Sequence, residues 1–92
     1  MPRVRLAAYP NPFNPRTTLS FSLDMPASGE LTIHDVSGRR IAVIATGDFL
    51  AGEHVVDWQG LDQSGRAVPS GTYVARLRTT EGVASRKLNL VR

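Results

Sequence analysis

The residues best suited to acid–base chemistry in this chain are two histidines and a few scattered carboxylates. His34 and His54 are the only histidines, and the sequence contains no cysteine. General acid–base or nucleophilic catalysis needs such a group held in a pocket beside a partner. His34 falls on the strand face opposite Leu31 and Ile33, which predicts that it faces solvent. The spacing specifies no pair of nucleophile and base, so the sequence favours a domain that is not an enzyme.

A calcium site is the second kind of chemistry that the acidic residues could support. Asp57 and Asp62 flank a loop after Trp58, and the second of them opens the run Asp-Gln-Ser-Gly. Calcium binds several carboxylate and carbonyl oxygens, whereas this loop supplies few carboxylates and lacks the spacing of an EF-hand. Asp first and Gly fourth is also typical of a β-turn. The sequence favours the turn and assigns no metal ligand or cofactor, while calcium at residues 57–62 stays open.

Basic side chains gather near the end of the chain. The net charge is +3, and Lys87 is the only lysine among eleven basic residues. Arg76, Arg78, Arg86 and Arg92 accompany it on the last two expected strands. A nucleic-acid surface would interleave aromatic rings with these cations for base stacking, and none are interleaved here. We therefore expect no nucleic-acid partner, although an acidic or anionic partner fits this patch.

Size and composition indicate one globular domain of 92 residues. Hydrophobic residues make up 41% and charged residues 21%, with no apolar run long enough to cross a bilayer. The first six residues include two arginines but are followed by no apolar segment, so they do not form a secretory signal peptide. Residues 1–8 are predicted to be a linker remnant or a short first strand, with the domain over residues 9–92. An exported parent protein would then carry its signal elsewhere.

Apolar residues alternate with polar ones along most of the chain, which is the pattern of half-buried antiparallel strands. No window of helical length shows an apolar repeat. Turns are expected at residues 25–29 and 47–52. The strands are expected at residues 17–23, 30–36, 40–45 and 53–59. A turn-rich loop is expected at residues 60–66, and the final hairpin, from Ser70 to Arg92, turns at Glu81-Gly82. The predicted fold class is all-β, an immunoglobulin-like antiparallel β-sandwich of about seven strands.

Prolines dominate the segment before the first long strand. It reads Tyr9, Pro10, Asn11, Pro12, Phe13, Asn14, Pro15. Each proline fixes its own φ and holds the preceding residue extended, so we expect a rigid loop rather than a helix. Tyr9 and Phe13 are expected to act as apolar pegs, and Asn11 and Asn14 to bond neighbouring backbone in Asx-turns.

Several residues have an expected place in the core or in the last hairpin. Trp58, the only tryptophan, is expected at the core centre, because a large ring gains roughly 3 kcal/mol or more on burial. Gly71 is expected to let the chain enter a strand, and the Tyr73 hydroxyl to bond backbone as a tyrosine corner. In the final strand Leu88 and Leu90 are predicted to point inward, with Lys87 and Asn89 outward.

The whole pattern resembles the type IX secretion system type A C-terminal sorting domain. It is similar as well to that family's structural relative, the immunoglobulin-like domain of the flagellar hook-capping protein. The resemblance covers residues 9–92 and rests on the segments 9–15, Asp35-Val36-Ser37-Gly38-Arg39, Ala51-Gly52-Glu53-His54, Trp58, 62–65, Ser70-Gly71-Thr72-Tyr73 and Arg86-Lys87.

The resemblance implies a non-catalytic module at the C-terminus of a secreted protein, recognised by an outer-membrane translocon or its receptor after the cargo reaches the periplasm. The expected location is the cell surface or the medium, and the expected state is a monomer attached to an N-terminal cargo domain. By carry-over, the sorting-motif residues are Gly71, Tyr73, Arg86, Lys87, Leu88, Leu90 and Val91, while Asn11, Pro12, Phe13, Asn14, Pro15 and Trp58 form the structural motif.

Two other functions remain open from the sequence. One is a structural immunoglobulin-like module of a flagellar or extracellular assembly without targeting activity. The other is a small carbohydrate-binding domain, which would need exposed aromatic rings on one face. For the sorting function, a receptor could read the final hairpin by strand addition at a sheet edge.

Overall fold

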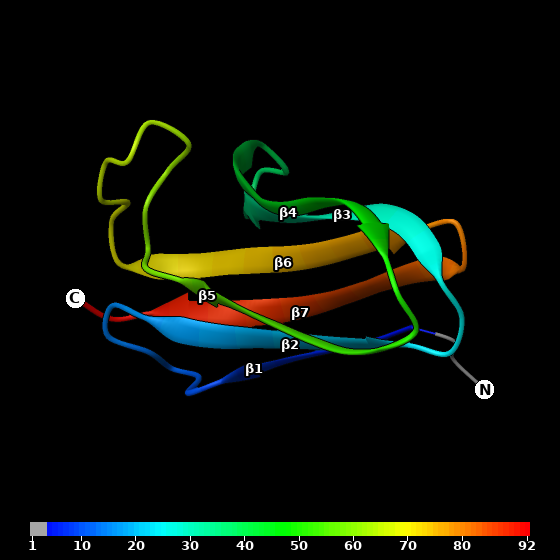
Figure 1. The fold of residues 1–92 in the computed structure, drawn as a ribbon. Coiled ribbons are helices and arrows are strands. Elements are labelled where there is room, and N and C mark those ends of the chain that lie inside the picture. Colours follow the sequence, from blue (N-terminus) through cyan, green and yellow to red (C-terminus); the bar gives the residue numbers. More distant parts are fainter. Residues whose placement is uncertain (1–3) are drawn as a thin grey trace.

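The computed structural model describes residues 4–92 and contains seven strands that form two facing antiparallel sheets (Figure 1). The strands are β1 (Val4–Tyr9), β2 (Thr17–Leu23), β3 (Ala27–Asp35), β4 (Arg40–Phe49), β5 (Gly52–Trp58), β6 (Gly71–Thr79) and β7 (Gly82–Leu90). One sheet has the order β1-β2-β5 and the other β4-β3-β6-β7. This arrangement confirms the predicted all-β sandwich.

The core follows from the two-residue period of the strands. Leu19 of β2, Leu77 of β6 and Leu88 of β7 are fully buried between the sheets, while the residues between the inward positions turn outward. Burial of each such leucine contributes on the order of 2 kcal/mol. The inward positions predicted for the last two strands are confirmed.

The two sheets meet along one flank, where β1 lies beside β7 (Figure 1). β1 pairs with β2 from Val4 opposite Leu23 to Tyr9 opposite Thr18. Residues 4–8 of the expected linker or first strand therefore lie within β1, and residues 1–3 of that expectation lie outside the described residues.

The β3–β4 hairpin is longer than the sequence indicated. Turns were expected at 25–29 and 47–52, yet Ala27 pairs with Phe49, and Gly29 faces Gly47 in the ladder. Glycine weakens a strand, and a facing pair of glycines therefore looks like turn sequence. Of the two apolar residues expected to cap the core, only Phe49 packs against it, with its ring 5.2 Å from that of Phe21.

The expectation that His34 faces solvent is wrong, since this side chain is only 9% exposed. Its Nε2 lies 2.8 Å from the Thr32 hydroxyl, and its Nδ1 lies 3.3 Å from the carbonyl oxygen of Gly38. β3 is an inner strand between β4 and β6, and Thr32, the partner of His34, is buried as well. The alternation of apolar and polar residues predicted correctly that His34 lies on the outer face of β3. At this position, however, the outer face is not open to water.

Candidate functional site

The proline-rich segment lies along the outer edge of the closing strand. Phe13 N–H donates to the carbonyl of Asn89, and Val91 N–H donates to the carbonyl of Phe13, each at 2.9 Å. These bonds form a parallel bridge between Phe13 and Leu90. The chain thus passes from the β1-β2-β5 sheet to the edge of the other sheet, because residues 10–13 leave the end of β1 and approach β7 before β2 begins.

Asn11 supplies a second pair of bonds to the same edge. Its side-chain amide donates to the carbonyl of Lys87 at 2.8 Å, and its oxygen accepts from Asn89 N–H at 3.0 Å. The Asx-turn expected at Asn11 is therefore wrong: its partners lie at the far end of the sequence. Within the described residues, Asn14 makes no side-chain hydrogen bond, so the two asparagines of the motif have different roles.

Three aromatic rings fill this end of the sandwich. The ring centroid of Trp58 lies 5.7 Å from that of Phe13 and 5.5 Å from that of Tyr73. Trp58 is 3% exposed and donates its indole N–H to the carbonyl of Leu61 at 2.9 Å. The predicted core position of Trp58 and the packing of Phe13 are confirmed, and the cluster couples the proline-rich segment to β5 and β6.

Tyr9 does not share that packing and is 81% exposed, so its expected role as an apolar peg is wrong. It is the last residue of β1 and lies on the outer side of its sheet. A carbohydrate site would need several exposed rings on one face. Phe13 and Tyr73 are buried, which leaves this function without the aromatic surface that it requires.

Tyr73 forms the expected tyrosine corner. Its hydroxyl donates a 2.6 Å hydrogen bond to the carbonyl of Pro69, four residues earlier, where the chain enters β6. Burial raises the pKa of the Tyr73 hydroxyl above its ordinary value of 10.0, while the nearby positive charge of Arg92 acts in the opposite direction. Gly71, at the start of the same strand, is exposed.

The side chain of Arg92 folds back over the loop between β5 and β6. Its Nε donates to the carbonyl of Val68 at 2.6 Å, and its Nη2 donates to the carbonyl of Gly60 at 2.5 Å. Its main-chain N–H also bonds the Ser70 hydroxyl. The sequence predicted only that Arg92 belongs to a basic surface patch. The one related signal in the sequence is a glycine in the loop that follows Trp58.

The basic patch expected on the last two strands is therefore divided. Lys87 points outward and is exposed. Arg86, its neighbour, points to the β1 side and donates from Nε to the carbonyl of Leu6 at 2.7 Å. Arg76 and Arg78 remain on the outer side of β6, and neither takes part in an ion pair among the described residues.

The residues carried over as a sorting motif fall into two groups. Tyr73, Leu88 and Leu90 are buried, so a partner could not touch them on the folded domain. The accessible members are Gly71, Arg86, Lys87 and Val91. Val91 is 53% exposed although it follows a buried leucine.

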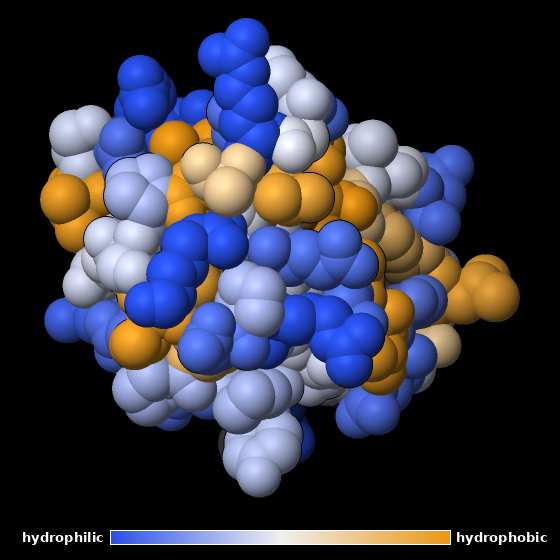
Figure 2. All heavy atoms as spheres, turned by 90° about the vertical axis from the view of Figure 1, so that its left-hand side faces the viewer, coloured by the Kyte–Doolittle hydropathy of each residue, from blue (hydrophilic) through white to orange (hydrophobic). Residues whose placement is uncertain are grey.

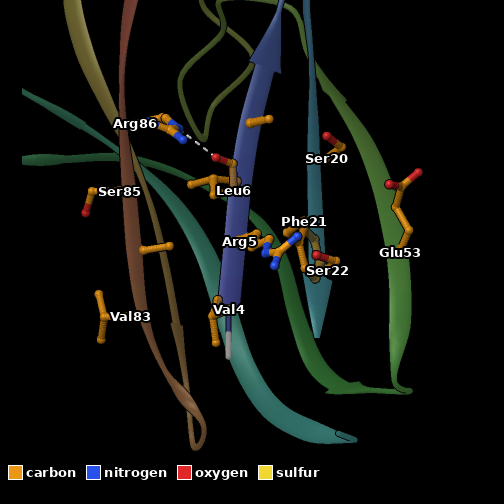
Figure 3. Close-up of a pocket in the computed structure, with 12 residues that line it drawn as sticks. Val4, Arg5, Leu6, Ser20, Phe21, Ser22, Glu53, Val83, Ser85 and Arg86 are labelled. Atoms are coloured by element: carbon orange, nitrogen blue, oxygen red, sulfur yellow. Dashed lines mark hydrogen bonds between the residues drawn. The ribbon is translucent and has the colours of Figure 1, made fainter. Parts of the chain in front are cut away.

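A groove of about 700 Å³ lies between β1 and the first half of β7 (Figure 3). Arg5 and Leu6 line one side and Val83 to Arg86 the other, with the Arg86–Leu6 hydrogen bond crossing between the two strands. Small serines of β2 and Glu53 of β5 extend the lining over the neighbouring sheet face.

Two turns, one between β3 and β4 and one in the loop between β5 and β6, share the sequence pattern Asp-x-Ser-Gly-Arg and the same hydrogen-bond geometry. Asp35-Val-Ser-Gly-Arg39 and Asp62-Gln-Ser-Gly-Arg66 each close with a bond from the glycine N–H to the aspartate carbonyl. In both, the aspartate Oδ1 accepts from the serine and arginine N–H groups. Gly38 and Gly65 have φ of 92° and 84°, which favours glycine. The Ser37 hydroxyl, together with these N–H groups, holds the pKa of Asp35 below its usual value.

These contacts bear on the calcium alternative. The predicted β-turn at residues 62–65 is confirmed by the bond from Gly65 N–H to Asp62. Asp57 accepts from the Thr18 hydroxyl at 2.9 Å and lies 3.8 Å from the Arg16 guanidinium. Across residues 4–92, no three His, Asp or Glu side chains come together as metal ligands would.

The second of these turns also covers a sheet edge. Gln63 N–H donates to the carbonyl of Ile41 at 3.1 Å, and its side-chain oxygen accepts from Val43 N–H at 2.7 Å. Part of the free edge of β4 is thus closed to other strands. Figure 2 views this end of the sandwich, where hydrophilic side chains cover much of the middle and apolar surface shows between them. In the described part of the chain, no helix is long and apolar enough to cross a bilayer.

A family model, the FlgD Ig-like domain, matches residues 11–82. This span includes the proline-rich segment, Trp58 and the tyrosine corner, and stops at the start of β7. No curated protein matches the chain.

Three solved structures share the fold. A part of PorZ, described as an essential surface component of the type-IX secretion system of Porphyromonas gingivalis, matches 95% of this chain with a TM-score of 0.65 and 20% identity. FlgD of P. aeruginosa matches 97% of this chain with a TM-score of 0.62 and 23% identity. The alkylpurine DNA glycosylase AlkC of Pseudomonas fluorescens matches 98% of this chain with a TM-score of 0.62 and 18% identity. The chain covers 11%, 77% and 31% of these proteins, so for PorZ and AlkC it corresponds to one part of a larger molecule.

Proposed function

Since the chain belongs to the FlgD Ig-like domain family, we propose that it is a non-catalytic C-terminal sorting and anchoring module of a secreted protein. It directs an N-terminal cargo domain across the outer membrane through the type IX secretion system. The recognising partner is the translocon or its sorting receptor. The destination is the cell surface or the medium, reached through the periplasm, and the module acts as a monomer without a cofactor.

The alternation of buried and exposed side chains along the closing strand is the observation that carries this proposal. Leu88 and Leu90 anchor β7 in the core, while Lys87 and Val91 between and after them are presented to solvent. A receptor could therefore read alternate side chains of an ordered strand without unfolding the domain. The fold shared with a part of PorZ adds support, because an immunoglobulin-like domain also occurs within a surface component of that system.

An export assay tests the proposal. The domain is fused to the C-terminus of a periplasm-directed fluorescent reporter, in a host with a working type IX system and in its translocon-null sibling. Reporter on the surface or in the medium of the competent host alone is the expected result. Periplasmic reporter in both hosts, with the domain shown to be folded, would overturn it.

Point variants are better suited than truncation to locate the signal. Deletion of residues 87–92 would also remove the buried Leu88 and Leu90 and the Arg92 contacts, and would therefore unfold the domain. Lys87→Glu changes an exposed side chain and is expected to reduce export. Arg78→Glu, on the outer side of β6, is the matched charge control and is expected to leave export unchanged.

A structural module without targeting activity is the second candidate. It is favoured by the family match and by the 77% of the P. aeruginosa FlgD structure that this chain covers. Under this function, replacement of Lys87 would leave secretion of the parent protein unchanged. The defect would instead appear in assembly, measured as loss of the parent protein from isolated surface or flagellar structures.

A further inference from the structure

The outer edge of β7 has two halves with different surroundings. Along the second half, the chain's own residues Asn11 and Phe13 bond Lys87, Asn89 and Val91. Along the first half, β1 pairs with β2 instead, and no ladder joins β1 to β7. On its second half, the outer edge of β7 thus already binds an extended segment of the same chain.

Main-chain groups on the first half point into the groove. Successive residues of a strand direct their N–H and C=O groups to alternate edges. Because the carbonyls of Lys87 and Asn89 face the outer edge, those of Val83 and Ser85 face it as well. The groove of about 700 Å³ between β7 and β1 gives a strand access to them. A single side-chain bond, from Arg86 to the Leu6 carbonyl, crosses it within hydrogen-bond distance (Figure 3).

The charges beside this edge indicate what would occupy it. Arg5 and Arg86 are exposed, and neither forms an ion pair within residues 4–92. Glu53 is the one carboxylate among the residues that line the groove. Val83 is 63% exposed and adds an apolar contact at the start of β7. The lining is thus complementary to an extended segment that carries acidic side chains next to an apolar one.

We propose that the first half of the β7 edge, residues Val83–Arg86, binds an extended acidic segment of a partner protein by strand addition. This inference rests on the proposed function, since it names the part of the closing hairpin that the sorting receptor reads. The segment pairs with the main chain of Val83 and Ser85. The guanidinium of Arg86 exchanges the carbonyl of Leu6 for a carboxylate of the partner, which is the stronger acceptor.

Peptide binding to the isolated domain tests this step separately from export. The probe is a capped peptide of about eight residues, an ordinary strand length, that alternates valine with glutamate and threonine. A second peptide carries lysine in place of glutamate. Binding is followed by amide chemical shifts and hydrogen exchange of the labelled domain. The expected result is that the acidic peptide alone binds, with slowed exchange at Val83 and Ser85.

Two pairs of variants locate the site. Ser85→Pro removes an N–H that faces away from β6 and is expected to abolish binding, whereas Ser85→Ala keeps that N–H and binds as the wild type does. Arg86→Gln is expected to weaken binding about tenfold, the loss of one charge-assisted bond, whereas Arg78→Gln on the outer side of β6 has little effect.

Several results would overturn the proposal: no binding of the acidic peptide at millimolar concentration, equal binding of both peptides, or shifts confined to another surface. Equal weakening by Arg86→Gln and Arg78→Gln would reduce the interaction to general charge attraction. Should Ser85→Pro fail to fold, the Arg86 and Arg78 pair decides alone. A domain that exports its reporter but binds no peptide refutes only the edge site, and a domain that binds but does not export refutes the sorting role.

Discussion

The side chain of Asn11 bonds both the carbonyl of Lys87 at 2.8 Å and the N–H of Asn89 at 3.0 Å, and so acts as a short extra strand on the edge of β7. An asparagine amide reproduces the donor and acceptor of a peptide group. The opening segment of the domain and its closing strand are therefore one structural unit, although they lie at opposite ends of the sequence.

Replacement of Asn11 is expected to loosen this unit. Asn11→Ala should lower the free energy of unfolding by about 1–2 kcal/mol, because two partly exposed hydrogen bonds are lost. Urea denaturation measures the change, and hydrogen exchange at Asn89 should accelerate. Asn14→Ala removes the same side chain where it makes no hydrogen bond among the described residues, and should stay within about 0.5 kcal/mol of the wild type. Equal effects of the two variants would contradict the edge role of Asn11.

The tyrosine corner should contribute a measurable part of the stability. Tyr73→Phe keeps the buried ring and removes only the bond to Pro69, so a loss of about 1 kcal/mol is expected in denaturant titrations. Tyr9→Phe is the control, because Tyr9 is exposed and its hydroxyl makes no hydrogen bond within residues 4–92. An unchanged stability of Tyr73→Phe would mean that the hydroxyl bonds solvent equally well.

The raised pKa of Tyr73 adds a dependence on alkaline pH. Its folded-state pKa lies above the unfolded value of 10.0, so its contribution to stability is present below pH 10 and is lost as pH rises through the folded pKa. Unfolding midpoints measured from pH 8 upward should therefore decline more steeply for the wild type than for Tyr73→Phe. Parallel curves would exclude this titration.

Gly60 and Arg92 should be energetically coupled. Gly60 has φ of 71°, so Gly60→Ala carries a backbone cost of about 1–2 kcal/mol. The new methyl group would also lie 2.7 Å from the Arg92 guanidinium and displace it. Gly65→Ala, at φ of 84° with open space around it, reports the backbone cost alone. The excess loss at Gly60 should shrink in an Arg92→Ala background, where contacts with the Pro15 carbonyl at 3.2 Å and the Leu90 side chain at 3.3 Å remain. Additive losses in that double-mutant cycle would contradict the coupling.

Asp35 should make the domain sensitive to acid. The bond from the Ser37 hydroxyl lowers the folded-state pKa of Asp35 below the model-compound value of 3.8, so its contribution is present above that value and is lost as pH falls through the folded pKa. Asp35→Asn should therefore show a smaller difference in stability between pH 7 and pH 2.5 than the wild type. Asp24→Asn, at an exposed position, should retain the full difference. The reverse order would assign the acid sensitivity to other carboxylates.

Strand alternation was sufficient to predict the sandwich, the inward residues of β6 and β7 and the place of Trp58, because each depends on a period of two within one strand. It failed at the β3–β4 hairpin, where Gly29 and Gly47 face each other and look like turn residues. It also failed at His34, since the cover over a central strand comes from neighbouring strands, which one strand's sequence does not describe.

The candidate site was less predictable because its contacts join residues far apart. Nothing near Asn11 or Arg92 in the sequence indicates partners 76 or 32 residues away. The similar turns at Asp35 and Asp62 were visible as sequence, and the second was predicted as a turn. That Gln63 within it covers the edge of β4 depends on the path of the whole loop.

The parallel contact between the proline-rich segment and β7 also determines how the domain would bear a mechanical load. The start of β1 and the C-terminus lie at opposite ends of the molecule (Figure 1). Tension between them draws Phe13 toward the start of β1 and β7 toward the C-terminus, so the two segments are sheared past each other. The bonds at Asn11 and Phe13 then bear the force together rather than opening in succession, and this patch resists extension along with the β1–β2 ladder.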